Sequence, residues 1–149
     1  MNDLELIGVG KTYPDGTVAV SDFDLAVKPG EFVAFLGPSG CGKSTTLRMI
    51  AGFEDISNGD ILIKGKNVSA VPPEKRPTSM IFQNYALFPH MTVRQNIGFG
   101  LDVKGLSSGE KKAKVDRIME MFGLSEFADR KADRLSGGQH QRIALARGL

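Results

Sequence analysis

The segment from Gly37 to Ser44 constrains the fold of this chain more than any other feature of its sequence. It reads Gly-Pro-Ser-Gly-Cys-Gly-Lys-Ser and matches the pattern G-x-x-x-x-G-K-[ST] at every fixed position. The apolar run Phe32–Leu36 precedes it and predicts a fully buried strand. The apolar spacing over Leu47–Ala51 predicts a helix that begins near Gly42. A strand, a glycine-rich loop and a helix in this order are the context in which the pattern binds phosphate.

The loop has the chemistry of a polyphosphate site. Its glycines allow backbone N–H groups to turn inward, and the start of a helix favours an anion. The pattern directs Lys43 to the β- and γ-phosphates and the hydroxyl of Ser44 to Mg²⁺, and we expect Thr45 to donate to the α-phosphate. The predicted nucleotide-binding residues of the loop are Gly37, Pro38, Ser39, Gly40, Cys41, Gly42, Lys43, Ser44 and Thr45. Kinases, GTPases and transport ATPases all carry such a loop, so it predicts a nucleotide site without naming the class.

Composition excludes several other kinds of protein. The 149 residues include 19 basic and 17 acidic side chains, and this small excess does not predict a nucleic-acid partner. The single cysteine excludes an internal disulfide framework and the Cys₄ and Cys₂His₂ zinc sites. The apolar runs fall far short of the ~20 residues that span a bilayer, and the start resembles no signal peptide. We therefore expect a soluble, cytoplasmic chain of single-domain size.

Periodicity and turn signals divide the rest of the chain into strands first and helices later. A Pro-Gly turn is expected within Lys28–Glu31, and Gly52 is expected to end the helix after the loop. From Gln83 onward helices dominate, and Ser107 with Glu110 forms a predicted capping box. The further predicted strands are Leu4–Val9, Thr17–Val20, Phe23–Lys28, Asp60–Lys64 and Ser79–Phe82.

A second glycine cluster, Leu135-Ser136-Gly137-Gly138-Gln139, opens the last predicted helix. Ser136 and Gln139 form a capping box, and the two glycines occupy the first turn, where glycine costs ~1 kcal/mol relative to alanine. Such residues suggest that another group approaches the backbone closely, and a phosphate is the natural candidate. A merely flexible helix entry is the alternative for the cluster taken alone.

The run Leu135–Arg142 closely resembles the signature of ATP-binding cassette (ABC) transporter ATPases, and the loop Gly37–Ser44 resembles their phosphate loop. The resemblance implies an α/β P-loop NTPase fold with an N-terminal antiparallel β subdomain and a helical subdomain. It implies that Tyr13 stacks on adenine, although an ordinary turn tyrosine is the alternative. It also implies that Gln83 contacts Mg²⁺ and senses a transmembrane partner, so that Lys43 and Gln83 serve catalysis; a polar residue at a strand end is the alternative for Gln83.

The same resemblance implies an organisation and a set of partners. Residues 1–83 would form the β subdomain and phosphate-loop core, 84–135 the helical subdomain, and 136–149 the signature helix. Two copies would pair so that ATP lies between the loop of one subunit and Ser136, Gly137, Gly138 and Gln139 of the other. Membrane-spanning permease subunits would dock near Tyr85–His90 on the cytoplasmic face of the inner membrane, with a periplasmic binding protein as an indirect partner.

One part of the family pattern is not found in these residues. Family members place an apolar strand ending in Asp-Glu, and then a histidine, after the signature helix, and none of the ten residues that follow Gln139 is acidic. We therefore expect an N-terminal portion of a longer transport ATPase, with an incomplete core sheet, that binds ATP without hydrolysing it. An open apolar sheet edge would favour dimerisation or aggregation.

The run Phe82–Val93 resembles bacterial importer subunits for polyamines, sugars or ferric ions. Phe88 and the run Arg76–Thr78 favour the polyamine branch, for spermidine or putrescine. A sugar or ferric-ion importer is the first alternative, and a soluble ABC protein of DNA repair or translation, with no transport role, is the second. A simple P-loop kinase is a third, which leaves the signature unexplained.

Overall fold

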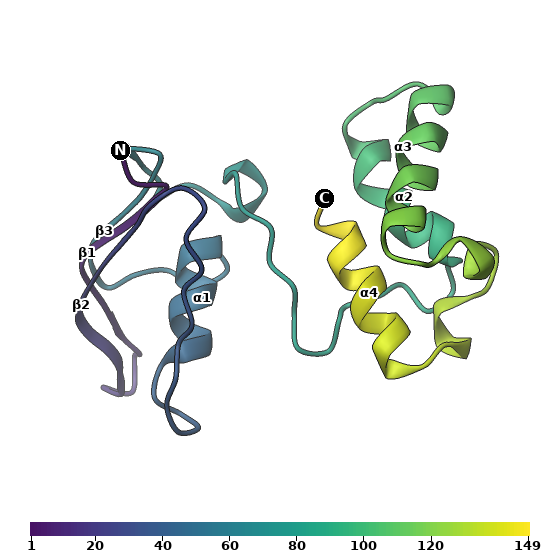
Figure 1. The fold of residues 1–149 in the computed structure, drawn as a ribbon. Helices are drawn as coiled ribbons and strands as arrows, with labels where there is room; N and C mark the ends of the chain where they lie inside the picture. The colour runs from purple at the N-terminus through teal and green to yellow at the C-terminus, as the bar shows by residue number, and fades with distance from the viewer. The chain divides into compact units, whose positions relative to one another are not determined.

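An antiparallel sheet forms from the alternating sequences near the N-terminus. The computed structural model describes residues 1–149 in two compact units, Met1–Thr78 and Ser79–Leu149 (Figure 1). The first unit holds the sheet in the order β2-β1-β3-β4. Its strands are β1 (Leu4–Thr12), β2 (Val18–Val27), β3 (Asn58–Ile63) and β4 (Lys66–Asn67). Two separately predicted strands, Thr17–Val20 and Phe23–Lys28, are therefore one strand, β2.

The predicted turns and helix ends of the first unit are confirmed. Gly30 has φ +78°, and the backbone N–H of Glu31 donates to the carbonyl of Lys28 at 3.1 Å, which closes the Pro-Gly turn. Gly52 has φ +84° and ends helix α1 (Lys43–Ala51), because this left-handed conformation carries no Cβ penalty for glycine.

Helix α1 buries Thr46, Met49 and Ala51. Met49 is fully buried among Leu6, Val9 and Ile61, whereas Leu47 is 47% exposed. Of the apolar residues whose spacing predicts the helix, Ala51 is buried and Ile50 packs against the same core cluster.

The predicted buried strand Phe32–Leu36 is wrong for this chain. The segment has no sheet hydrogen bonds, and Phe32 and Leu36 are 94% and 91% exposed. Of this run, Phe35 contacts the unit's interior, with its ring edge-on to Phe23 at 6.0 Å between centroids. A strand needs partners for its N–H and C=O groups, and the four strands of the unit pair only with one another.

A buried arginine holds the C-terminal end of α1. Arg76 is 8% exposed, and its guanidinium donates to the carbonyls of Met49 at 2.7 Å and Ile50 at 3.0 Å. It also donates to Val71 at 2.7 Å and Ser69 at 3.3 Å. Burial lowers the pKa of Arg76, and these carbonyls replace the water that the guanidinium loses. The cation also lies where the negative end of the helix dipole favours it.

Helices form the second unit, with α2 (Val93–Val103), α3 (Ser108–Met121) and α4 (Gly137–Arg147) around one core (Figure 1). The predicted capping box of Ser107 and Glu110 is confirmed at the start of α3. The buried core residues are Val93, Ile97, Leu101, Val115, Ile118, Met119, Leu124, Ala128, Ile143 and Ala146. Short 3₁₀ turns lie at Pro73–Lys75 in the first unit and at Ser125–Phe127 and Ala132–Arg134 in the second.

The predicted strand over Ser79–Phe82 is also wrong. No strand partner pairs with this segment, and Ile81 is 43% exposed. The reason is the one that applies to Phe32–Leu36: an apolar run becomes a strand only beside another strand. No helix of the structure is both long and apolar enough to cross a membrane.

Replacing Arg76 with Met should lower the free energy of unfolding by about 2–4 kcal/mol, because the carbonyls of Met49 and Ile50 would lose a buried donor. Urea unfolding followed by circular dichroism measures this. The matched control is Arg48→Met on the exposed side of α1, with an expected change within about 0.5 kcal/mol. Equal stability of the two variants would contradict the role of Arg76.

Candidate nucleotide-binding site

Two glycines fix the loop that precedes α1. Gly42 has φ +90°, and a Cβ at this position would lie 2.5 Å from the backbone oxygen of Ala19 in β2. A Cβ at Gly37 would lie 2.7 Å from the sulfur of Cys41. A larger residue at position 42 would therefore collide with the backbone of β2, and one at position 37 would require the Cys41 side chain to move. The loop owes its shape to these close approaches.

The side chain of Lys43 reaches back to the start of the loop. Its Nζ donates to the backbone oxygens of Gly37 and Pro38, both at 2.6 Å, and lies 3.3 Å from Cys41 Sγ. These acceptors are neutral, whereas a phosphate oxygen carries charge and forms a stronger bond with an ammonium group. A phosphate in the loop would therefore compete well for Lys43.

The N-terminus of α1 fits an anion. Gly42 is the N-cap and has no side chain to accept from the first-turn N–H groups, and that turn holds no acidic residue. The hydroxyl of Thr46 donates to the carbonyl of Gly42 at 2.9 Å, and no side chain caps the first-turn N–H groups. Bare helix donors together with the helix dipole attract a phosphate.

The loop offers few side chains that could bind a metal ion. Ser44 is exposed in the first turn of α1, and no group of three or more His, Cys, Asp or Glu residues is arranged to hold a metal. Mg²⁺ often keeps several waters and takes phosphate oxygens beside one or two protein ligands. The residues present would fit Mg²⁺ bound together with a nucleotide, to which the Ser44 hydroxyl could contribute one ligand.

Tyr13 lies at the end of β1 in the tight turn that leads to β2. Its N–H donates to the carbonyl of Thr17 at 2.8 Å, and its own carbonyl accepts from Gly16 at 2.9 Å. Lys11 pairs with Val20 across the sheet, one residue from the Ala19 oxygen that Gly42 approaches. The loop and the Tyr13 turn therefore meet the same end of the β1–β2 pair. The side chain of Tyr13 is half-buried.

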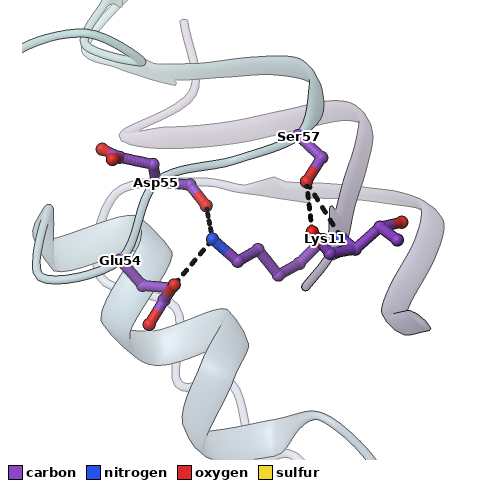
Figure 2. A network of polar contacts seen from close by, with 5 residues as sticks. Lys11, Glu54, Asp55 and Ser57 are labelled. Carbon is purple, nitrogen blue, oxygen red and sulfur yellow. Dashed lines mark hydrogen bonds and ion pairs between the residues drawn. The ribbon is translucent and has the colours of Figure 1, made fainter. Parts of the chain in front are cut away.

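Beside Tyr13, polar contacts tie the end of β1 to the segment that follows α1 (Figure 2). The Nζ of Lys11 donates to the backbone oxygen of Asp55 at 2.7 Å and lies 2.6 Å from a carboxylate oxygen of Glu54. Ser57 Oγ accepts from the N–H of Thr12 at 2.9 Å and donates to its carbonyl at 3.1 Å. These contacts fix the start of β3 against β1.

The predicted signature residues begin α4 in the second unit. The Oγ of Ser136 accepts from the N–H of Gln139, whose side chain in turn accepts from the N–H of Ser136 at 2.9 Å, so the predicted capping box is confirmed. A Cβ at Gly137 or Gly138 would meet no atom within 4 Å. Packing within the chain therefore does not demand glycine at these two positions, which leaves their exposed backbone open to another molecule.

The predicted Gln83 and the segment Tyr85–His90 lie in turns of the second unit. Gln83 is exposed, and the next turn holds Tyr85 and Ala86 at φ +61° and +45°, a conformation that non-glycine residues rarely adopt. Arg147 of α4 donates to the carbonyl of Ala86 at 2.6 Å and stacks its guanidinium 4.9 Å from the ring centroid of Phe88. Burial lowers the pKa of Arg147.

A buried amide sets the shape of the end of this segment. Asn96 of α2 is fully buried, and its Oδ1 accepts from the N–H of Phe88 at 2.9 Å. Its Nδ2 donates to the carbonyls of Phe88 at 3.0 Å, Thr92 at 3.1 Å and Met91 at 3.3 Å. One side chain thereby satisfies the backbone between Phe88 and the start of α2.

The structure brings the predicted loop residues 37–45 together at one helix start, with Tyr13 at the neighbouring sheet end. Gln83 and Ser136–Gln139 belong to the second unit, and their roles toward a nucleotide stay predictions. Sequence reasoning missed Lys11 and Asn96, and it missed the buried bonds of Arg76 to backbone carbonyls. Their isolated polar side chains gave no periodic signal, and only the folded backbone shows the carbonyls that they reach.

Comparison with known proteins gives consistent results along the chain. A family model described as ABC transporter matches residues 20–149. The chain is 53% identical over 149 residues to the spermidine/putrescine import ATP-binding protein PotA of Frankia alni, covering 98% of this chain and 32% of that protein. It is 49% identical over 148 residues to PotA of Roseobacter denitrificans, and the match covers 99% of this chain and 40% of that protein. It is 50% identical over 149 residues to the oligosaccharides import ATP-binding protein MsmX of Bacillus subtilis, and the match covers 100% of this chain and 41% of that protein.

These curated relatives are longer than the chain, which spans between 32% and 41% of their length. The matched part includes the loop before α1 and the start of α4, the two glycine-rich segments described above. The resemblance of both segments to one family is therefore confirmed along most of the chain.

Replacing Gly42 with Ala should cost far more stability than replacing Gly40. Both have positive φ, at +90° and +80°, but the new Cβ would collide with Ala19 only at position 42. We expect Gly40→Ala to cost about 1–2 kcal/mol from backbone strain alone, and Gly42→Ala to exceed that and to displace the start of α1. Urea unfolding of the two variants measures the difference. Equal losses would show that the close approach to β2 does not shape the loop.

Proposed function

The chain belongs to the ABC transporter family, and from that premise we propose that it is the nucleotide-binding part of an ATPase that powers solute import. The observation that carries the proposal is the bare N-terminus of α1 with Lys43 across the loop before it. A helix start without a side-chain acceptor, beside an ammonium that donates to the backbone carbonyls of Gly37 and Pro38, is suited to a polyphosphate. ATP is the proposed ligand, bound together with Mg²⁺.

Different residues bind different parts of the nucleotide. The N–H groups of Gly40, Gly42 and the first turn of α1 bind the phosphates, and Lys43 exchanges its loop carbonyls for β- and γ-phosphate oxygens. Thr45 donates to the α-phosphate, and Ser44 contributes a ligand to Mg²⁺. When bound, Mg²⁺ neutralises charge between the β- and γ-phosphates. Pro38, Ser39 and Cys41 complete the loop, and Tyr13 stacks on the adenine.

A second copy completes the site. Ser136, Gly137, Gly138 and Gln139 close on the γ-phosphate of the partner's nucleotide, so that ATP holds two copies together as a homodimer. The open space above Gly137 and Gly138 supports this, because nothing within the chain requires glycine there. ATP favours the closed pair because it binds the closed pair more tightly than the open pair, and the free energy that drives closure is this difference in binding free energy.

Partners in the membrane dock on the second unit. We assign the Tyr85–His90 segment to permease contact at the cytoplasmic face of the inner membrane, with Gln83 next to it as the residue that contacts Mg²⁺ and reports docking. A periplasmic binding protein delivers the solute. Two of the relatives above are named for spermidine/putrescine import and one for oligosaccharides import, which favours a polyamine over a sugar as the solute.

Catalysis needs more than the loop. In-line attack on the γ-phosphate requires a group that orients water and an acidic residue near Mg²⁺. Lys43 and Gln83 are the proposed catalytic contributors within these residues. The 149-residue chain is expected to bind ATP without turning it over, and ATPase activity that is lost on Lys43→Ala would contradict this.

Cys41 provides a direct test of nucleotide binding, because it is exposed and is the only cysteine in the chain. Alkylation by N-ethylmaleimide, followed by mass spectrometry, should slow when Mg²⁺-ATP fills the loop. Lys43→Ala should weaken ATP binding about 10- to 100-fold through the loss of charge-assisted bonds, and protection at the same ATP concentration should disappear. Equal alkylation rates with and without ATP in the unaltered chain would contradict the proposed site.

Photo-crosslinking separates an importer subunit from a soluble ABC protein. A photoreactive residue in place of His90, an exposed position of the docking segment, should crosslink to a polytopic membrane protein in inside-out vesicles of the source cell. The same residue in place of Glu120, exposed on α3, is the matched control and should give no such product. Products of soluble proteins alone from the His90 variant would favour the non-transport alternative.

A further inference from the structure

The ammonium of Lys11 is held in place on two sides. It donates to the Asp55 carbonyl at 2.7 Å and pairs with Glu54 at 2.6 Å (Figure 2). The side chains of Lys11 and Glu54 are only 12% and 24% exposed. Salt and water screen a pair this shielded less than a surface pair, so the position of the ammonium is well defined.

The same ammonium lies over the ring of Tyr13, 5.2 Å from its centroid. A cation within about 6 Å of an aromatic centroid is attracted by the negative face of the ring. The main chain of Tyr13 is fixed separately, by its hydrogen bonds with Thr17 and Gly16. The turn thus fixes the backbone, and Lys11 restricts the rotation of the side chain.

Glu54 and Asp55 connect this contact to the loop. They follow α1 closely, since the helix ends at Ala51 and begins at Lys43 beside the loop. The anchors of Lys11 therefore follow the C-terminal end of the same helix whose N-terminus offers the N–H groups proposed to bind phosphate. The ring of Tyr13 is held relative to the same element that presents the loop.

We propose that Lys11 is a positioning residue for Tyr13, which holds the ring where an adenine base stacks while the phosphates occupy the loop. The inference rests on the proposed function, because it requires that the loop binds the phosphates of ATP. A ring that is already held loses less side-chain entropy when the base arrives. Lys11 acts through Tyr13 and needs no contact with the nucleotide.

Isothermal titration with two ligands tests this role. Mg²⁺-ATP carries a base and phosphates, whereas Mg²⁺-tripolyphosphate carries phosphates alone. Lys11→Met should weaken ATP binding by about three- to tenfold, because the freed Tyr13 ring would then lose side-chain entropy on binding the base, with tripolyphosphate binding unchanged. Lys11→Arg should restore most of the ATP affinity. Lys66→Met, at an exposed lysine of β4, removes the same charge and should change neither ligand.

A second readout uses the fluorescence of Tyr13. The chain has no tryptophan and two tyrosines, so Tyr85→Phe leaves Tyr13 as its single tyrosine emitter. ATP should quench this emission, and tripolyphosphate should not.

Glu54→Gln keeps Lys11 but weakens its anchor, and it should show a smaller selective loss of ATP affinity. This variant decides the question if Lys11→Met unfolds.

The outcomes distinguish the two proposals. Equal weakening of both ligands in Lys11→Met and Glu54→Gln would make Lys11 a structural residue and overturn the inference. Unchanged ATP affinity in both variants would also overturn it. If the unaltered chain binds neither ligand, the proposed function fails and the role of Lys11 fails with it. If the unaltered chain binds ATP and tripolyphosphate equally, stacking on Tyr13 is absent while the phosphate site stands.

Discussion

The close approach of Gly42 to β2 is the constraint on which the candidate site depends. A residue with a Cβ would collide with the Ala19 oxygen, so α1 can begin at this place only with glycine as its N-cap. A glycine cap offers no side-chain acceptor, and the first-turn N–H groups are left for a ligand. Arg76 fixes the opposite end of the helix by its bonds to Met49 and Ile50. The anion site is thus a consequence of how the helix is seated.

The two glycine-rich helix starts differ in a way that matters for their proposed roles. At α1 the cap has no side chain, whereas at α4 Ser136 and Gln139 already satisfy part of the helix end through their capping box. The first helix start therefore has more unpaired donors to offer a phosphate than the second. This difference agrees with a primary phosphate site at α1 and a supplementary contact from α4 of a second copy.

Local signals in the sequence predicted the local structure well. The Pro-Gly turn at Gly30, the helix end at Gly52 and the capping boxes at Ser107 and Ser136 all formed, because each depends on residues close in the chain. The strand predicted over Phe32–Leu36 failed, because a strand depends on a partner that no local pattern supplies. The hydrogen bonds of Lys11 and Asn96 could not be predicted for a related reason, because their carbonyl partners come together only in the folded chain.

The central claim is that the residues before and within the first turn of α1 bind the phosphates of ATP. Nuclear magnetic resonance of the ¹⁵N-labelled chain titrated with Mg²⁺-ATP tests it most directly, because each backbone amide reports separately. The account predicts saturable shifts of the amides of Gly40, Gly42, Lys43 and Ser44, reproduced by tripolyphosphate, with a further shift at Tyr13 for ATP alone. Saturable shifts confined to other segments, or none at millimolar ATP, would contradict it.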